Sequence, residues 1–69
     1  MKAKVTKLGG KVEEVTLEGE TSTVTAVLEQ AKIHPEDQDV ILLGGRQVSG
    51  DQPVQEGEVV IAVPAVKGG

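Results

Sequence analysis

The chain ends in Gly68-Gly69, and the carboxylate of Gly69 is the group in this sequence with the clearest potential for chemistry. Glycine has no Cβ, so two glycines in a row can pass through a channel too narrow for other residues. An α-carboxylate is ionised at neutral pH and is therefore a poor electrophile. A partner that uses ATP would have to activate it first, as an acyl-adenylate with AMP as the leaving group.

The remaining polar residues do not form a catalytic or metal-binding set. His34 is the only histidine and there is no cysteine, whereas a structural zinc site needs about four protein ligands. Ser22 and Ser49 have no candidate base other than His34, so no activated nucleophile is expected. We predict no catalytic residue, no metal site and no bound cofactor. The chain is then not an enzyme, and ATP is used only by the partner that activates the carboxylate.

Composition excludes several classes of partner. The 69 residues carry a formal net charge of -4 and contain no aromatic side chain. Nucleic-acid and anionic-membrane partners require clustered Lys and Arg, and single strands also need aromatic residues for stacking. No apolar stretch approaches the roughly 20 residues that span a bilayer, and residues 1–4 do not lead into a signal peptide. We expect a cytoplasmic protein whose partner presents a basic docking face.

The first 18 residues predict a β-hairpin. Apolar and polar residues alternate over 2–8 and again over 12–18, and Gly9-Gly10 between them suits a tight turn. Val12 is out of phase with the apolar residues that follow it. This predicts a bulge near Glu13.

A short helix is predicted next. Residues 21–23 are Thr-Ser-Thr, three candidate N-caps in a row. From Val24 onward, apolar residues recur at i, i+3, i+4 and i+7, the spacing of a buried helical stripe. Pro35 limits the helix, because the residue before a proline is disfavoured in the α region.

The second half predicts three more strands. An acidic loop over 36–39 leads into strands at 40–43 and 46–48, and a connecting loop over 52–57 leads into a last strand at 59–63. Pro64 ends the sheet, because its nitrogen cannot donate a ladder hydrogen bond.

These elements predict an α+β fold, a mixed four- to five-stranded sheet with one helix packed across one face. We expect a single domain over 1–64, followed by a flexible C-terminal tail over 65–69.

A helix covers only one face of such a sheet, so the other face must carry part of the apolar residues. Side chains alternate between faces along a strand. If Ile41, Leu43, Val60 and Ala62 point at the helix, the residues between them point away. This predicts an exposed apolar patch beside the tail, which we expect to dock the adenylating partner: Val40, Leu42, Ile61 and Val63.

The tail carries a family resemblance. Its sequence Pro64-Ala65-Val66-Lys67-Gly68-Gly69 resembles the ending of the MoaD and ThiS sulfur carriers, a Pro-x-Val-x-Gly-Gly pattern after the last strand. The stretch from Gly45-Arg46-Gln47-Val48 to the last strand is similar to the second half of the same family. The Lys-Gly-Gly end also looks like that of the small archaeal modifier proteins, and residues 1–11 resemble ubiquitin. The resemblance implies a ubiquitin-like β-grasp fold.

The resemblance also implies partners and a function. An adenylyltransferase of the MoeB/ThiF type would activate Gly69, and the product would be a thiocarboxylate. A sulfur-accepting synthase would then use it for molybdopterin, thiamine or tRNA thiolation. The alternative is a protein modifier, joined through Gly69 to lysines of target proteins. A third reading is a non-covalent β-grasp adaptor, for which the tail is irrelevant. In the first two readings Val66 and Lys67 are the tail residues that lead to Gly68 and Gly69.

Overall fold

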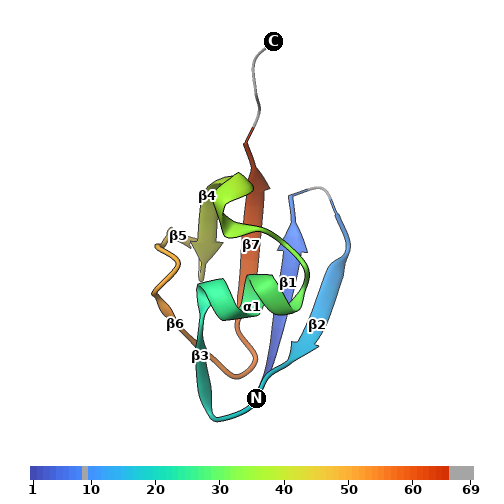
Figure 1. The fold of residues 1–69 in the computed structure, drawn as a ribbon, viewed down its shortest axis with the longest axis vertical. Helices are drawn as coiled ribbons and strands as arrows, with labels where there is room; N and C mark the ends of the chain where they lie inside the picture. The colour runs from blue at the N-terminus through green and yellow to red at the C-terminus, as the bar shows by residue number, and fades with distance from the viewer. Residues whose placement is uncertain (9, 66–69) are drawn as a thin grey trace.

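The computed structural model describes residues 1–8 and 10–65 (Figure 1). Their elements follow in this order: β1 (Lys2–Lys7), β2 (Val12–Thr16), β3 (Thr21–Thr23), α1 (Val24–Gln30), the 3-10 helix η1 (Pro35–Asp37), β4 (Gln38–Leu43), β5 (Arg46–Gln47), β6 (Pro53–Gln55) and β7 (Val59–Pro64).

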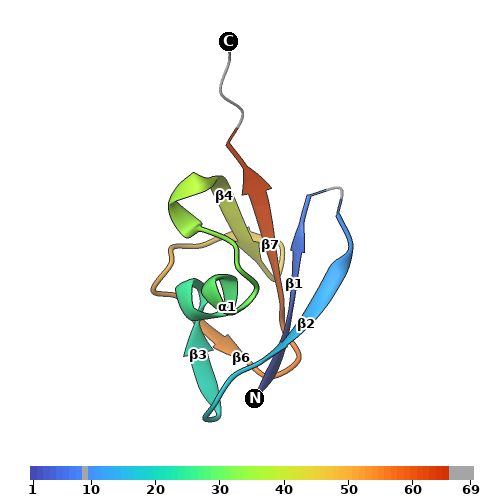
Figure 2. The same cartoon turned by 45° about the vertical axis from the view of Figure 1, so that its right-hand side comes forward.

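Five of the strands form one mixed sheet in the order β2-β1-β7-β4-β5. Strands β1 and β7 run parallel at its centre, and the other pairs are antiparallel. Helix α1 crosses one face of this sheet, as the two views of the ribbon show (Figures 1 and 2). The predicted fold class, an α+β β-grasp fold with one helix on a mixed sheet, is confirmed.

The core lies between α1 and the sheet. Val24, Val27 and Leu28 of the predicted helical stripe are fully buried, and Thr23 caps the helix by accepting a hydrogen bond from the amide of Ala26 at 3.2 Å. Aliphatic side chains of the sheet face them and fill the core without an aromatic residue: Ala3, Val5, Val15, Leu43, Val60 and Ala62.

Two expectations from the sequence were wrong, one for a loop and one for a strand. Residues 52–57 were expected to connect strands, but β6 lies within them and pairs with β3 in a separate two-stranded ladder. Val54 at its centre has no exposed surface and belongs to the core. The predicted bulge near Glu13 is also absent, because β1 and β2 pair in unbroken register. Val12 simply points to the other face of the sheet and is 59% exposed.

Helix α1 ends through a left-handed residue, well before Pro35. Lys32 has a φ of 62°. Its amide donates to the carbonyl of Glu29 at 3.0 Å, and the amide of Ile33 donates to the carbonyl of Leu28 at 2.8 Å. These two bonds form a Schellman motif. Pro35 instead begins η1, so part of the segment predicted as an acidic loop is a 3-10 turn.

The end of β7 fixes where the chain leaves the sheet. The strand ends at Pro64, and the amide of Ala65 still donates to the carbonyl of Asp37 at 3.1 Å. Ala65, where the flexible tail was expected to begin, thus has one backbone contact with the body of the protein, and the tail over 65–69 stays a prediction. Residues 66–69 lie outside the described part of the chain.

Candidate functional site

The predicted reactive tail is attached at the end of a central strand. Val66, Lys67, Gly68 and Gly69 lie outside the described residues, so their sequence alone supports their assignment. Strand β7, which leads to them, lies between β1 and β4. The described part of the chain ends just after this strand, at the opposite end of the molecule from the N-terminus (Figure 1).

The four residues of the predicted docking patch lie together. Val40 is paired with Val63, and Leu42 is paired with Ile61, across the antiparallel ladder of β4 and β7. All four are partly exposed, whereas Leu43, Val60 and Ala62, which alternate with them, are buried in the core under α1. The patch thus occupies the face of the sheet away from the helix. Its role in docking stays a prediction.

Two further residues, which were not predicted from the sequence, extend this patch. The amide of Leu8 donates to the carbonyl of Ala62 at 2.9 Å, which continues the parallel register and places Leu8 beside Val63. Leu8 is 66% exposed, and Val59, two residues before Ile61 on the same face, is 37% exposed. Leu8 has the same strand phase as Lys4 and Thr6, so the alternation could have identified it. We call the six residues the outer apolar face: Leu8, Val40, Leu42, Val59, Ile61 and Val63.

Polar residues border the outer apolar face. Lys4 lies between Glu14 of β2 and Val59 of β7, and Gln47 of β5 lies opposite Leu42. An apolar centre with a polar border is the usual composition of a protein–protein interface. This arrangement suits contact with a protein better than it suits a small-molecule site.

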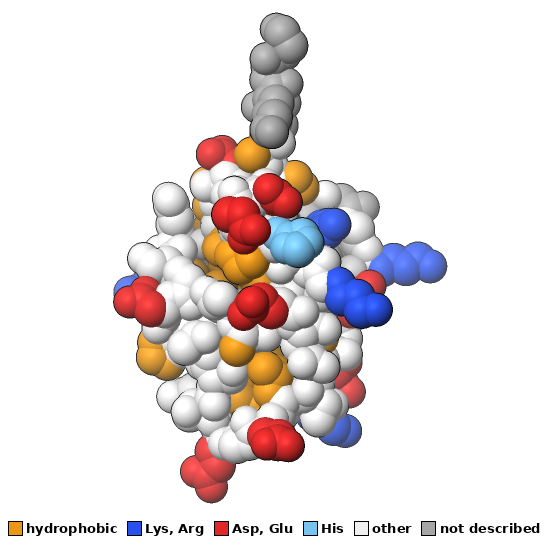
Figure 3. All heavy atoms as spheres, viewed as in Figure 1, with side chains coloured by type: hydrophobic (Ala, Val, Ile, Leu, Met, Phe, Trp, Pro, Cys, Tyr) orange, Lys and Arg blue, Asp and Glu red, His pale blue; other side chains and the backbone are white. Residues whose placement is uncertain are grey.

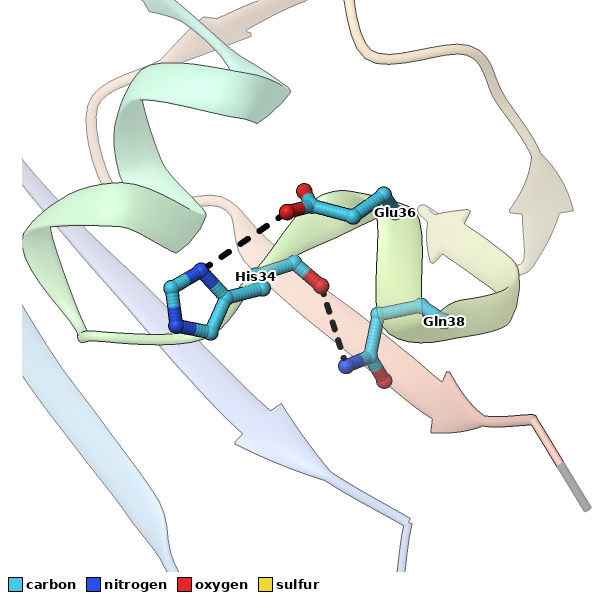
Figure 4. A network of polar contacts seen from close by, with 3 residues as sticks. All are labelled: His34, Glu36 and Gln38. Atoms are coloured by element: carbon cyan, nitrogen blue, oxygen red, sulfur yellow. Dashed lines mark hydrogen bonds and ion pairs between the residues drawn. The ribbon is translucent and has the colours of Figure 1, made fainter.

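The other candidates from the sequence do not form a reactive centre. His34 is 74% exposed, and its Nδ1 lies 3.9 Å from Oε1 of Glu36 (Figure 4). Its carbonyl accepts a hydrogen bond from Nε2 of Gln38 at 3.3 Å. An ion pair this exposed contributes little to stability. Ser22 lies in β3 and Ser49 in the loop after β5, and neither is among the hydrogen-bond or ion-pair partners of His34.

Metal-ligating side chains do not gather either: the described residues hold no group of three His, Cys, Asp or Glu side chains that could bind a metal ion. Within the same residues, no helix has the length and apolar character needed to cross a membrane.

Comparison with known proteins agrees with this geometry. The family model of small archaeal modifier protein 2 matches residues 1–62, which comprise the folded body as far as the middle of β7. The matched region ends before Gly68-Gly69. A search among curated proteins gives no match.

Proposed function

The chain belongs to the family of small archaeal modifier protein 2 and is a small ubiquitin-like modifier or sulfur carrier; we propose that it works through adenylation of the Gly69 carboxylate by a partner of the MoeB/ThiF type. The carboxylate attacks the α-phosphorus of ATP, pyrophosphate leaves, and an acyl-adenylate forms. The observation that carries this proposal is the Gly68-Gly69 end, placed just after the central strand of a body that matches the family.

The acyl-adenylate has two productive fates. Attack by hydrosulfide on the acyl carbon releases AMP and leaves a C-terminal thiocarboxylate, which supports sulfur transfer to molybdopterin, thiamine or tRNA. Attack by a lysine amine releases AMP and a proton and leaves an isopeptide bond to a target protein. We place the thiocarboxylate first, because the Pro64-x-Val66-x-Gly-Gly ending resembles that of the sulfur carriers. Both fates suit the cytoplasm, where ATP is available to the partner.

The folded body would supply the binding energy for activation. A glycine-rich tail loses conformational freedom when it enters an active site, and this cost must be offset by contacts elsewhere. The outer apolar face borders the end of β7 and fits this role, because Val63 directly precedes Pro64, and Leu8 and Val40 lie on either side of Val63. We propose this face as the docking surface for the adenylating partner.

The intact mass of the chain from its native host tests the tail chemistry. A mass gain equal to the difference between sulfur and oxygen, lost when Gly69 is deleted, supports the thiocarboxylate. Unmodified free chain together with higher-mass conjugates that vanish on the same deletion supports the modifier. If neither species forms, the adenylation proposal fails and a non-covalent adaptor takes its place.

Pyrophosphate exchange by the activating enzyme tests the docking surface. Leu8→Asp is the preferred variant, because a side chain 66% exposed can be replaced with little effect on folding. We expect its kcat/KM to fall by roughly fivefold or more, which corresponds to the loss of about 1 kcal/mol that marks an energetically important interface residue. Gln52→Asp, an exposed change of equal charge in the loop before β6, is the matched control and should keep its rate. Equal rates for the two variants would rule out this surface.

A further inference from the structure

A hollow on the helix side of the molecule brings together three lysines from separate segments. It lies between the end of the β1–β2 hairpin and the end of α1, and has a volume of about 200 Å³. Lys7, Lys11 and Lys32 line it, and Glu13 is the one acidic side chain among the described residues around it. Figure 3 shows basic side chains gathered on this side of the surface, next to the histidine. We call this feature the lysine hollow.

The charge of the lysine hollow is not neutralised within the described residues. Among the described residues, none of its three ammonium groups lies within 4.0 Å of a carboxylate oxygen. The one ion pair among these residues joins His34 and Glu36, which do not line the hollow. The chain as a whole has a net charge of -4, so a locally positive surface is the exception in this molecule. Like charges on Lys7, Lys11 and Lys32 repel one another, and an acidic ligand would relieve that repulsion.

The backbone at Lys32 provides a second, independent observation. Its φ of 62° is a conformation that glycine adopts freely and that costs a residue with a Cβ about 1–2 kcal/mol. Glycine is the usual residue at this position of a Schellman motif. The favourable charge at the negative end of the helix, worth about 0.3–1 kcal/mol, offsets only part of this cost. A lysine at this point therefore sacrifices stability and adds a positive charge to the hollow, the pattern expected where a side chain serves binding as well as folding.

We propose that the lysine hollow binds a segment of a protein partner that carries several Asp or Glu side chains. Its donors are exposed ammonium groups on flexible stems, and the nearby amide of Gly10 already donates to the carbonyl of Lys7 at 2.7 Å. Such donors suit several carboxylates spread along a chain better than one small anion, which needs donors of fixed geometry. A nucleic acid is disfavoured, because the net charge of -4 opposes binding of its closely spaced phosphates and the chain has no aromatic side chain on which bases could stack.

This inference goes beyond the proposed function and holds whatever reaction the tail undergoes. The hairpin end that carries Lys7 and Lys11 lies at the same end of the molecule as the end of β7 (Figures 1 and 2). The lysine hollow lies on the helix side, whereas the outer apolar face lies on the opposite side of the sheet. A single partner that holds both sides would enclose the end from which the tail leaves.

The test is an NMR titration of the ¹⁵N-labelled full chain with hexaglutamate as the probe. We expect saturable shifts of the amides of Lys7, Lys11 and Lys32, and weaker binding as salt is raised. Lys7→Gln and Lys11→Gln should each weaken binding by about 1.5- to 5-fold, the range of exposed ion pairs. Glu13→Gln removes a repelling charge and should strengthen binding by a similar factor. Arg46→Gln, the same change in charge on β5, should leave the affinity unchanged.

Lys32→Gly separates binding from folding. We expect this variant to bind hexaglutamate more weakly by the same 1.5- to 5-fold while remaining fully folded. Several outcomes would overturn the proposal. These are shifts spread evenly over all lysines, an equal loss of affinity for Arg46→Gln, and weaker binding for Glu13→Gln. Pyrophosphate or an oligothymidylate that binds the same amides as tightly as hexaglutamate would instead identify a small-anion or nucleic-acid site.

Discussion

Lys32 allows the strain at the end of α1 to be measured. A left-handed conformation costs a residue with a Cβ about 1–2 kcal/mol, and glycine avoids this cost. Glycine also loses more backbone freedom on folding than alanine does, and this cancels about 0.4–1 kcal/mol of that advantage in stability. With the charge held equal, glycine at position 32 should therefore be more stable than alanine by about 0.8 kcal/mol, the difference between the midpoints of the two ranges. In a domain of this size that difference corresponds to about 3–6 °C in Tm.

The comparison of Lys32→Gly with Lys32→Ala carries this test. Both variants lose a charge at the negative end of the helix, which alone is worth about 0.3–1 kcal/mol, so their difference isolates the backbone. Urea unfolding followed by far-UV circular dichroism is the suitable assay, because the chain has no aromatic residue for fluorescence. A Lys32→Ala variant at least as stable as Lys32→Gly would refute the argument from backbone strain.

Three other substitutions test the packing that holds the site, each by urea unfolding. Thr23→Ala removes the cap on the amide of Ala26 and should lower the free energy of unfolding by about 1 kcal/mol, whereas Ser22→Ala, which removes no cap, should change it little. Gly50→Ala places a Cβ against Oγ1 of Thr25, which donates to the Gly50 carbonyl at 2.9 Å. We expect a loss of about 1–3 kcal/mol, and a loss in the double variant with Thr25→Ala that is smaller than the sum. Val54→Ala should cost about 1–3 kcal/mol because its side chain is fully buried, and Val59→Ala, at a position 37% exposed, should cost clearly less.

Much of the fold was predictable because its longer elements repeat their pattern over several residues. The hairpin and the helix from Val24 show clear periods in the sequence, whereas β4 and β7 are marked by uninterrupted apolar runs; each forms within two residues of its expected bounds. Because side chains alternate between the faces of a sheet along a strand, Leu42 and Leu43 must lie on opposite faces once a register is chosen. Leu8 follows the same rule, and its place on the outer apolar face could have been read from its phase.

The tertiary structure decided what short segments do. Strand β6 has three residues, too few to show a period, and it forms because β3 lies beside it and Val54 fills the core. The left-handed turn at Lys32 has no local signal either, since glycine is the residue expected there.

The sequence by itself therefore determined the fold class, the Gly68-Gly69 end and which residues share a face, whereas the structure decided which of the two sets faces the helix. Only folding brought Lys32 to Lys7 and Lys11, because Lys32 follows Lys11 by 21 residues and lies after a different element. They meet where the hairpin of β1 and β2 approaches the end of α1, and that contact is set by the packing of the helix on the sheet. Local patterns predict elements, whereas a site assembled from several elements depends on how those elements pack.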